Sequence, residues 1–289
     1  MLGSAAGGGF PQWNCRCPAC DLAWAADPRV TPRTQTSLAV SADGDRWTLI
    51  NASPDLRQQI QATPALHPRG LRASPIGAVV LTGGEIDQIA GLLSLREGSP
   101  FALYATGETL GAIAANAMFS ATHAMRRESV SFGESIELPG IAAELFAVPG
   151  KAPLYREGDD PVLDAETEAN AGIELRAGGK RLVFIPGAAA VTSAMRERCM
   201  RADVVLFDGT FCTDDELQKL AAGKTGRRMG HMPIAGTSGS LAALRGIECR
   251  RVYIHINNTN PVLIAGSPER KMVEAAGWEI AHDGMEIVL

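Results

Sequence analysis

The segment VVLTGGEIDQIAGL, residues 79–92, decides the fold class, because an apolar run passes through a glycine-containing loop into a helical pattern. The apolar run predicts a buried strand, and the residues from about 88 onward predict a helix. Short strand-like runs and helical patterns alternate in this way along the whole chain, which indicates a mixed α/β architecture. The predicted strands are 37–40, 47–50, 76–81, 101–104, 142–148, 182–185, 204–207, 252–256 and 286–289, and the predicted helices are about 54–62, 88–96, 107–118, 191–200, 213–221, 237–245 and 267–276.

The composition is that of a globular protein with a large buried core. Of the 289 residues, 46% are hydrophobic and 20% are charged, and 27 Lys plus Arg against 32 Asp plus Glu give a net charge of −5. This acidic balance argues against a general nucleic-acid binder, which presents a basic surface. No run approaches the roughly 20 apolar residues that a membrane span needs, and the N-terminal segment lacks the basic and apolar regions of a signal peptide. We therefore expect a cytoplasmic protein that forms one domain over residues 1–289, with an acidic surface loop, acting as a lid or an insertion, at 151–170.

Three of the six cysteines lie close together, at Cys15, Cys17 and Cys20. Three thiolates within one loop can converge on a single tetrahedral ion, so we predict a structural zinc site. A redox role is the alternative, because Cys17 and Cys20 have the spacing of thiol–disulfide exchangers. Those motifs normally open a helix after a strand and carry no third cysteine. Unligated thiols are a further alternative, and the fourth zinc ligand stays open among Asn258, Asp21 and a histidine.

The glycine-rich opening GSAAGGG, residues 3–9, is similar to a phosphate cradle, in which a turn aims backbone N–H groups at an anion. The dinucleotide-binding motif G-x-G-x-x-G does not occur in this segment. Elsewhere in the chain, Gly223-Lys224-Thr225 matches the end of a P-loop motif, but Gln218 stands where that motif needs its first glycine. A tight structural turn is the favoured interpretation.

Polar side chains gather at the ends of predicted strands. They are Asp87, Asp208, His231 in the loop Gly230-His231-Met232, and His255 followed by Asn257, Asn258 and Asn260. Because such groups converge on one edge of a sheet, we expect a site there. Each group also has a structural alternative: Asp87 could cap a helix, Asp208 could form a turn, His255 could be a satisfied core histidine, and the asparagines could form Asx turns.

The order of several motifs resembles the metallo-β-lactamase superfamily, whose fold is an αββα sandwich. Within that superfamily the chain is most similar to the PqqB family of pyrroloquinoline quinone (PQQ) biosynthesis proteins. The motifs that carry the resemblance are GSAAGGGFPQWNCRCPAC (3–20), NASPDLRQQI (51–60), VPGKAPLY (148–155), FIPG (184–187), LFDGTF (206–211), MGHM (229–232) and HINNTNP (255–261).

The chain departs from the superfamily at its metal ligands. The superfamily motif T-H-x-H-x-D-H, placed on Thr82 onward, keeps its aspartate at Asp87, and His255 also matches a ligand position. The other ligand positions are substituted, and they are Gly83, Glu85, Gln88, Lys151 and Gly187-Ala188. A two-zinc hydrolase with a bridging hydroxide is therefore not expected.

One metal ion could still bind to the remaining ligands. Asp87 and His255, together with Glu85 or Asp208, supply oxygen and imidazole ligands that suit iron(II) or manganese. Gln88 occupies a ligand position but supplies only a weak neutral amide. The resemblance implies an iron-dependent hydroxylation, with oxygen, of the tyrosine-derived ring in a cross-linked Glu–Tyr precursor.

Other residues are assigned to catalysis and substrate binding. Asp208 and His231 could form a proton-transfer pair instead of metal ligands, as in related phosphodiesterases of the superfamily. Lys151 is also a catalytic candidate because it takes the place of a ligand. The expected substrate-binding residues are Asn257, Asn258 and Asn260, and the expected basic entrance consists of Arg57, Lys151, Lys224, Arg227 and Arg228.

Two hypotheses follow for function, and a third is less favoured. The first is an iron-dependent oxygenase in PQQ biosynthesis, and the second is a carrier that binds PQQ or its precursor for transport or export without turnover. A phosphodiesterase or other hydrolase is the third, and the missing histidines argue against it. The resemblance also implies that the cysteine zinc site, which we call the zinc knob (residues 15–20), supports a homodimer.

Overall fold

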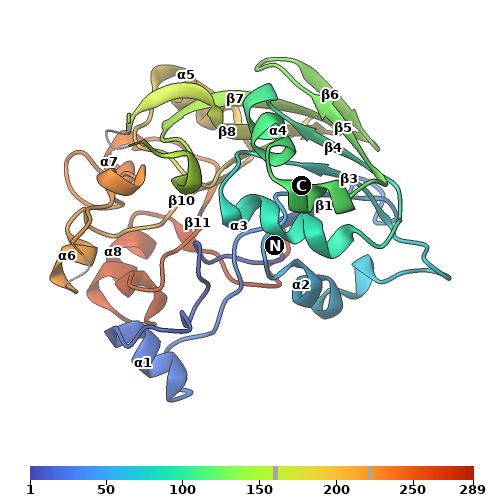
Figure 1. The fold of residues 1–289 in the computed structure, drawn as a ribbon. Helices are drawn as coiled ribbons and strands as arrows, with labels where there is room; N and C mark the ends of the chain where they lie inside the picture. Colours follow the sequence, from blue (N-terminus) through green and yellow to red (C-terminus); the bar gives the residue numbers. More distant parts are fainter. Residues whose placement is uncertain (159–161, 221–222) are drawn as a thin grey trace.

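The structure is a computed structural model that describes residues 1–158, 162–220 and 223–289. Two sheets stack face to face, and helices cover the outer face of each sheet (Figure 1). The layers therefore follow the order α, β, β, α. The predicted α/β class and the αββα sandwich are confirmed.

The first sheet has five strands in the spatial order β1–β2–β3–β4–β5. Its first pair is antiparallel and the other neighbouring pairs are parallel. The strands are β1 (Leu38–Val40), β2 (Trp47–Ile50), β3 (Ile76–Val80), β4 (Phe101–Ala105) and β5 (Met125–Ser129).

The second sheet has seven strands in the spatial order β12–β11–β10–β9–β8–β7–β6. β9, β10, β11 and β12 run parallel, whereas β6, β7, β8 and β9 pair antiparallel. The strands are β6 (Ser135–Leu138), β7 (Ile141–Gly150), β8 (Ala165–Ala177), β9 (Lys180–Ile185), β10 (Val204–Asp208), β11 (Arg250–Ile254) and β12 (Glu279–Ile280).

Short helices connect the strands, and within the described residues none is long and apolar enough to cross a membrane. The α-helices are α1 (Pro18–Trp24), α2 (Leu56–Ala62), α3 (Ile86–Ile89), α4 (Gly107–Ala114), α5 (Ser193–Arg201), α6 (Glu216–Lys219), α7 (Ser240–Ala243) and α8 (Pro268–Ala275). The 3₁₀ turns are η1 (Pro64–Leu66), η2 (Ala90–Leu95), η3 (Ala117–Ala121), η4 (Leu154–Arg156), η5 (Arg227–Met229) and η6 (Pro261–Leu263).

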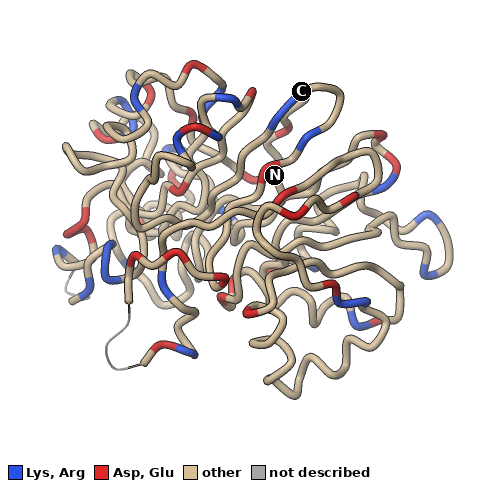
Figure 2. Tube along the Cα trace, turned by 90° about the horizontal axis from the view of Figure 1, so that it is seen from above, with Lys and Arg blue, Asp and Glu red and all other residues tan. Residues whose placement is uncertain are grey.

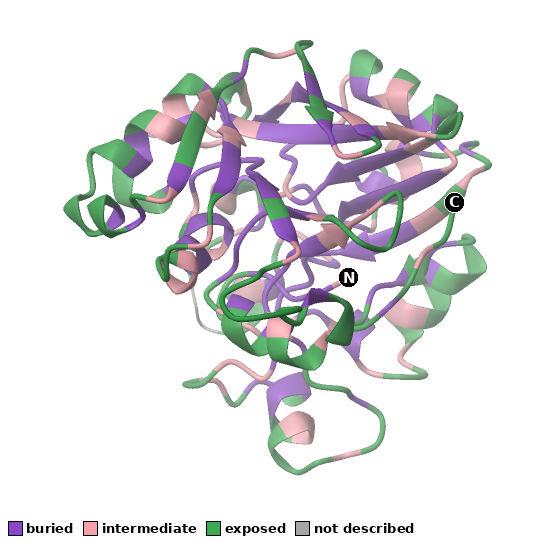
Figure 3. Cartoon of the chain, turned by 90° about the vertical axis from the view of Figure 1, so that its right-hand side faces the viewer, coloured by how far each residue is buried: buried purple, intermediate pink, exposed green. Residues whose placement is uncertain are grey.

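The central strands are buried on both faces, which explains their continuous apolar runs (Figure 3). Successive side chains of β3 point to opposite faces of the sheet. Val80 packs between the two sheets with Leu206 and other residues of the second sheet, whereas Val79 packs outward with Leu56 of α2. On the other side of the sandwich, Phe207 packs outward among residues of α5 and α8.

Most predicted strands are confirmed, and the strand at 286–289 is wrong. That segment forms no strand, and Ile287 packs against the core between the sheets without pairing. The strands β5, β6, β8 and β12 were not predicted. β5 has the sequence MRRES at the edge of its sheet, so its backbone pairs while most of its side chains face solvent, and no apolar run marks it.

The predicted loop at 151–170 is wrong over its last part, because β8 begins at Ala165 and pairs with β7 as far as Gly150. Backbone hydrogen bonds hold this first part of β8 in the sheet, and they need no apolar side chains. Its acidic, weakly apolar sequence therefore did not predict a strand. Residues 159–161 of the predicted loop lie outside the described residues. The helix α1 was also not predicted, since the cysteine cluster was assigned to a loop.

Lys and Arg are interspersed with Asp and Glu along the trace (Figure 2). Among the described residues, three carboxylates are buried: Glu174, Asp208 and Glu216. Glu174 is paired with arginines, at 2.9 Å from Arg181 and 3.1 Å from Arg198. The other two carboxylates lie near the site described below.

Gly172 in β8 is expected to be essential for packing, because it lies opposite Phe146 in β7. A Cβ atom at Gly172 would lie 2.3 Å from Cζ of Phe146, whose ring is covered by the Arg198 guanidinium at 4.7 Å from the ring centroid. We expect Gly172→Ala to lower the free energy of unfolding by about 1–3 kcal/mol, the usual cost of overpacking. Gly77→Ala is the matched control, since Gly77 is an exposed glycine of β3 with no atom near an added Cβ. Urea unfolding measures both variants, and equal stabilities would contradict the packing argument.

Candidate active site

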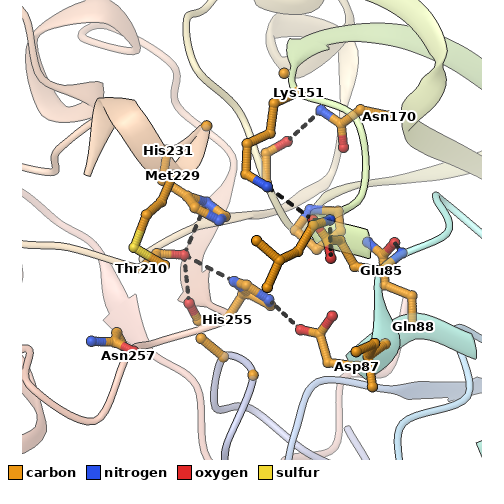
Figure 4. Close-up of a pocket in the computed structure, with 18 of the residues that line it drawn as sticks. Glu85, Asp87, Gln88, Lys151, Asn170, Thr210, Met229, His231, His255 and Asn257 are labelled. Carbon is orange, nitrogen blue, oxygen red and sulfur yellow. Dashed lines mark hydrogen bonds and ion pairs between the residues drawn. The ribbon is translucent and has the colours of Figure 1, made fainter. Parts of the chain in front are cut away.

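The predicted site residues meet at the edge where β3, β10 and β11 end. The loops that follow these strands, together with the segment after β7, surround a cavity of about 390 Å³ (Figure 4). The described residues that line it include Glu85, Asp87, Gln88, Lys151, Thr210, His231, His255 and Asn257. Gly7 and Gly8 of the glycine-rich opening also line it, so that turn brings the backbone to the cavity.

Asp208, which is fully buried, pairs with the partly buried His231. His231 Nδ1 lies 2.7 Å from Asp208 Oδ2, which also accepts the backbone N–H of Ala188 at 2.9 Å. Burial alone would raise the pKa of Asp208, but the charge and hydrogen bond of His231 outweigh it and hold the pKa below its usual range. Asp208 therefore remains an anion that orients the imidazole.

His255 lies at the end of β11 in the left-handed backbone region, with φ of 59°. Its Nε2 lies 2.9 Å from Asp87 Oδ2, and its Nδ1 lies 2.9 Å from Thr210 Oγ1. Burial opposes protonation of His255, but the hydrogen bond and charge of Asp87 outweigh it and raise the pKa of His255. The contact joins the first sheet to the second, so neither sheet contains the site alone.

The donor atoms of Asp208, His231 and His255 all lie within 4.8 Å of one another, which is close enough to hold a metal ion. The two imidazole rings stack with centroids 5.3 Å apart. Asp87 adds a second carboxylate through its contact with His255. Two histidines with a carboxylate are the ligand set of non-haem iron(II) sites, so this donor set fits a divalent metal.

Glu85 and Gln88 make other contacts and do not belong to this converging group. Glu85 is the N-cap of α3 and Gln88 completes a capping box, with Gln88 Oε1 accepting the backbone N–H of Glu85 at 3.2 Å. Glu85 also accepts a hydrogen bond from Lys151 Nζ at 3.2 Å. Glu85, and not Asp87, therefore caps the helix, and Asp87 lies in its first turn with its carboxylate directed at His255.

The predicted basic entrance is present only in part. Lys151, Lys224 and Arg228 line the cavity, and Lys151 lies between the carboxylates of Glu85 and Glu157, at 3.2 and 3.4 Å. The other two predicted members are elsewhere. Arg57 is exposed on α2, and the Arg227 guanidinium is bonded to Ser238.

The three predicted substrate-binding asparagines have different surroundings. Asn257 lines the cavity, whereas Asn258 and Asn260 are not among the described residues that do. Asn260 is fully buried, and its side chain donates to the backbone carbonyl of Gly209 at 2.9 Å. The side chain of Asn258 contacts the cysteine cluster instead of the cavity.

Cys15, Cys17 and Cys20 converge, with their sulfur atoms within 4.8 Å of one another. The side-chain nitrogen assigned to Asn258 lies 3.1, 3.7 and 3.4 Å from the three sulfur atoms. Of the fourth-ligand candidates, Asn258 is thus the one that faces the cluster. Asp21 pairs instead with Arg16.

The cluster begins a helix, with Cys17 at the N-cap of α1 and Pro18 in its first turn. The cluster thus opens a helix, as a thiol–disulfide exchanger does, and its assignment to a loop missed that helix. Among the described residues no named strand precedes α1, and the third cysteine is a further difference from the exchangers. Burial raises the pKa of Cys17 to about 12. An exchanger needs a lowered pKa, whereas a metal ion displaces the proton of a buried thiol. The cluster is thus suited to a metal ion.

Thr210 and Glu216 are the functional candidates that sequence reasoning missed. The Thr210 hydroxyl lies among Asp208, His231 and His255. Glu216 is a buried carboxyl beside Asn257, to which it is joined through Thr259. The motif LFDGTF contained a signal for Thr210, since it follows Asp208 at the end of a strand, but Glu216 had none.

Comparison with known proteins identifies the family. Residues 46–256 match the model of the beta-lactamase superfamily domain. A crystal structure of Zn²⁺-bound PqqB from Methylobacterium extorquens superposes with a TM-score of 0.98 at 55% identity, covering 100% of this chain and 98% of that one. Coenzyme PQQ synthesis protein B of Methylorubrum extorquens is 55% identical over 100% of this chain and 99% of its own length, and the Rhizobium meliloti protein of the same name is 50% identical, over 100% and 97%.

The chain is therefore a member of the β-lactamase superfamily, with its αββα fold. A diphosphatase from the PhnP family, at 20% identity and a TM-score of 0.71, shares this fold. Within the superfamily the chain belongs to the coenzyme PQQ synthesis protein B family, PqqB.

Replacing Cys17 tests the zinc knob. We expect the wild-type protein to hold one zinc ion at the cluster, and Cys17→Ser to lose that ion and to unfold at a lower temperature, because zinc binding contributes to folding free energy. Cys249→Ser is the matched control, since Cys249 is a half-buried cysteine outside the cluster. Elemental analysis and thermal unfolding measure both effects. Unchanged zinc content in Cys17→Ser would refute the assignment.

The buried carboxyl group of Glu216 should make the free energy of unfolding depend on pH. It accepts the backbone N–H of Cys212 at 2.8 Å, and burial raises its pKa from 4.5 to about 7. The unfolded chain releases this proton at a lower pH than the folded protein does. The free energy of unfolding should therefore fall as pH rises from about 4.5 to about 7, by up to about 1.4 kcal/mol per pH unit.

Glu216→Gln should remove this slope, because the amide resembles the protonated carboxyl. Glu248→Gln, at an exposed glutamate, should keep it. Denaturant unfolding at several pH values between 5 and 8 compares the two variants. An unchanged slope in Glu216→Gln would contradict the raised pKa.

Proposed function

We propose that this protein acts in PQQ biosynthesis as an iron-dependent oxygenase that hydroxylates the tyrosine-derived ring of a cross-linked Glu–Tyr precursor. The observation that carries the proposal is the convergence of Asp208, His231 and His255. The two histidines and Asp87 line the cavity, Asp87 contacts His255, and the fully buried Asp208 lies behind the cavity wall. The family name of the relatives, coenzyme PQQ synthesis protein B, supports the pathway.

The residues present fit a divalent metal. His255 and Asp87 would hold it, together with Asp208 and His231 from the converging group. Bound iron(II) would supply the activation of oxygen. The cavity of about 390 Å³ has the size of a small-molecule site.

The surrounding residues would position the substrate and handle protons. Lys151, Lys224 and Arg228 line the cavity and would attract the carboxylates of the precursor. Asp208 accepts a hydrogen bond from His231 Nδ1, which leaves Nε2 as the atom that can exchange a proton with the substrate. His231 could thus act as a ligand or as a base, and a His231→Gln variant separates the two roles, since only the loss of a ligand lowers metal affinity.

A carrier of PQQ or its precursor is the second candidate function. The observation in its favour is Gln88, which stands at a superfamily ligand position and instead completes the helix cap. A carrier would bind the product without turning over the precursor in the presence of iron and oxygen. Single-turnover assays with the precursor separate the two functions.

We also propose a homodimer that forms through the zinc knob, and a cytoplasmic location. Trp13 and Trp24, which are 83% and 48% exposed, flank the zinc knob in the sequence and offer an apolar contact surface. Sedimentation of Cys17→Ser should then show a shift toward monomer.

Replacing Asp87 tests the metal site. Asp87→Ala should stay folded and bind iron(II) about 100-fold more weakly or worse, since removing a ligand costs more than the 10–100-fold typical of changes around the ligands. Asp215→Ala is the control, because Asp215 is an exposed aspartate paired with Lys219. Anaerobic iron titration and precursor hydroxylation measure the outcome. Full hydroxylation by Asp87→Ala would show that the site is wrongly placed.

A further inference from the structure

The hydroxyl group of Thr210 contacts all three candidate metal ligands of the converging group, Asp208, His231 and His255. Thr210 follows β10 and is buried, and its Oγ1 lies 2.9 Å from His255 Nδ1 and 3.1 Å from His231 Nδ1 (Figure 4). The same oxygen lies 2.6 Å from Asp208 Oδ1. The backbone carbonyl oxygen of His255 lies 2.9 Å away as well. The hydroxyl is thus the shared neighbour of the whole group.

The direction of each hydrogen bond follows from counting protons. A threonine hydroxyl donates one hydrogen bond and accepts two, whereas a carboxylate only accepts. The Asp208 oxygen is charged and is the nearest acceptor, so it takes the hydroxyl proton in preference to the His255 carbonyl oxygen. The oxygen of Thr210 is then free to accept a hydrogen bond from an imidazole.

His255 is the imidazole that donates to Thr210. His231 Nδ1 is closer to Asp208 Oδ2, at 2.7 Å, than to Thr210, so its proton goes to the carboxylate. His255 Nδ1 has Thr210 as its partner, at 2.9 Å. In neutral His255 the proton is therefore on Nδ1, and Nε2 carries the lone pair.

This placement matters because Asp87 favours the opposite tautomer. Asp87 Oδ2 lies 2.9 Å from Nε2 of His255 and would attract a proton there. A neutral ring with its proton on Nε2 cannot bind a metal through that atom. Thr210 opposes this preference and leaves a lone pair and a carboxylate facing each other, an arrangement that a cation between them stabilises.

We infer that Thr210 is a positioning residue that holds His255 in the tautomer whose Nε2 binds the metal. This inference rests on the proposed function for the identity of the ligand, but the tautomer itself can be measured without metal. The general rule is that a metal-binding histidine donates its other ring N–H to a fixed partner. Here that partner is a hydroxyl fixed in turn by Asp208.

The test compares three variants of the full chain. Thr210→Val removes the hydroxyl and keeps the shape, Thr210→Ser keeps the hydroxyl, and Thr210→Ala replaces Thr210→Val if the latter does not fold by circular dichroism. Thr109→Val is the control for placing valine at a buried threonine, since Thr109 lies in α4 away from the cavity.

The first measurement is ¹⁵N NMR of histidine-labelled, metal-free protein at a pH above the raised pKa of His255, where the ring is neutral. The His255 signals are assigned from their loss in His255→Gln. We expect a proton on Nδ1 of His255 in the wild type, Thr210→Ser and Thr109→Val, and its loss in Thr210→Val. A persistent Nδ1 proton in Thr210→Val, or in Thr210→Ala, would overturn the inference.

The second measurement is Mn²⁺ titration followed by electron paramagnetic resonance, because Mn²⁺ prefers oxygen and imidazole ligands to the thiolates of the zinc knob. Thr210→Val should bind Mn²⁺ about 10–100-fold more weakly than the wild type, and Thr210→Ser should bind it with nearly wild-type affinity. Wild-type affinity in Thr210→Val would also overturn the inference. If the wild type and His255→Gln titrate alike, the proposed metal site fails instead, and the NMR result still decides the role of Thr210.

Discussion

The contact between Asp87 and His255 joins two parts of the chain that are 168 residues apart. Asp87 lies in the first turn of α3, which follows β3 of the first sheet, and His255 lies at the end of β11 in the second sheet. The sandwich brings these strand ends to the same edge because its core fixes how the sheets stack, with Val80 and Leu206 packed in the layer between them. The cavity, the converging donors and the tautomer of His255 all depend on that stacking.

The segment that follows β11 serves several neighbours at once. His255 and Asn257 face the cavity, Asn258 faces the three cysteine sulfur atoms, and Asn260 holds the backbone of Gly209. One short segment of the chain therefore contacts both the cysteine cluster and the cavity.

The charged side chains in the interior have different partners and therefore different roles. Glu174 is paired with arginines and supports the second sheet, whereas Asp208 is paired with an imidazole and orients it. Lys151 is held between two carboxylates at the wall of the cavity, so its charge is partly neutralised and its position is fixed.

Local sequence patterns were enough to predict the α/β class, the strand ends that carry Asp87, Asp208 and His255, and the cysteine cluster, because each depends on local periodicity or on close spacing. The tertiary structure decided which side chains meet. It directs Gln88 to a helix cap and Asn258 to the cysteines, and it places Thr210 among the histidines. These contacts, apart from the cap, join residues that are tens to hundreds of positions apart. They depend on the path of the chain through two stacked sheets, and no local pattern encodes that path.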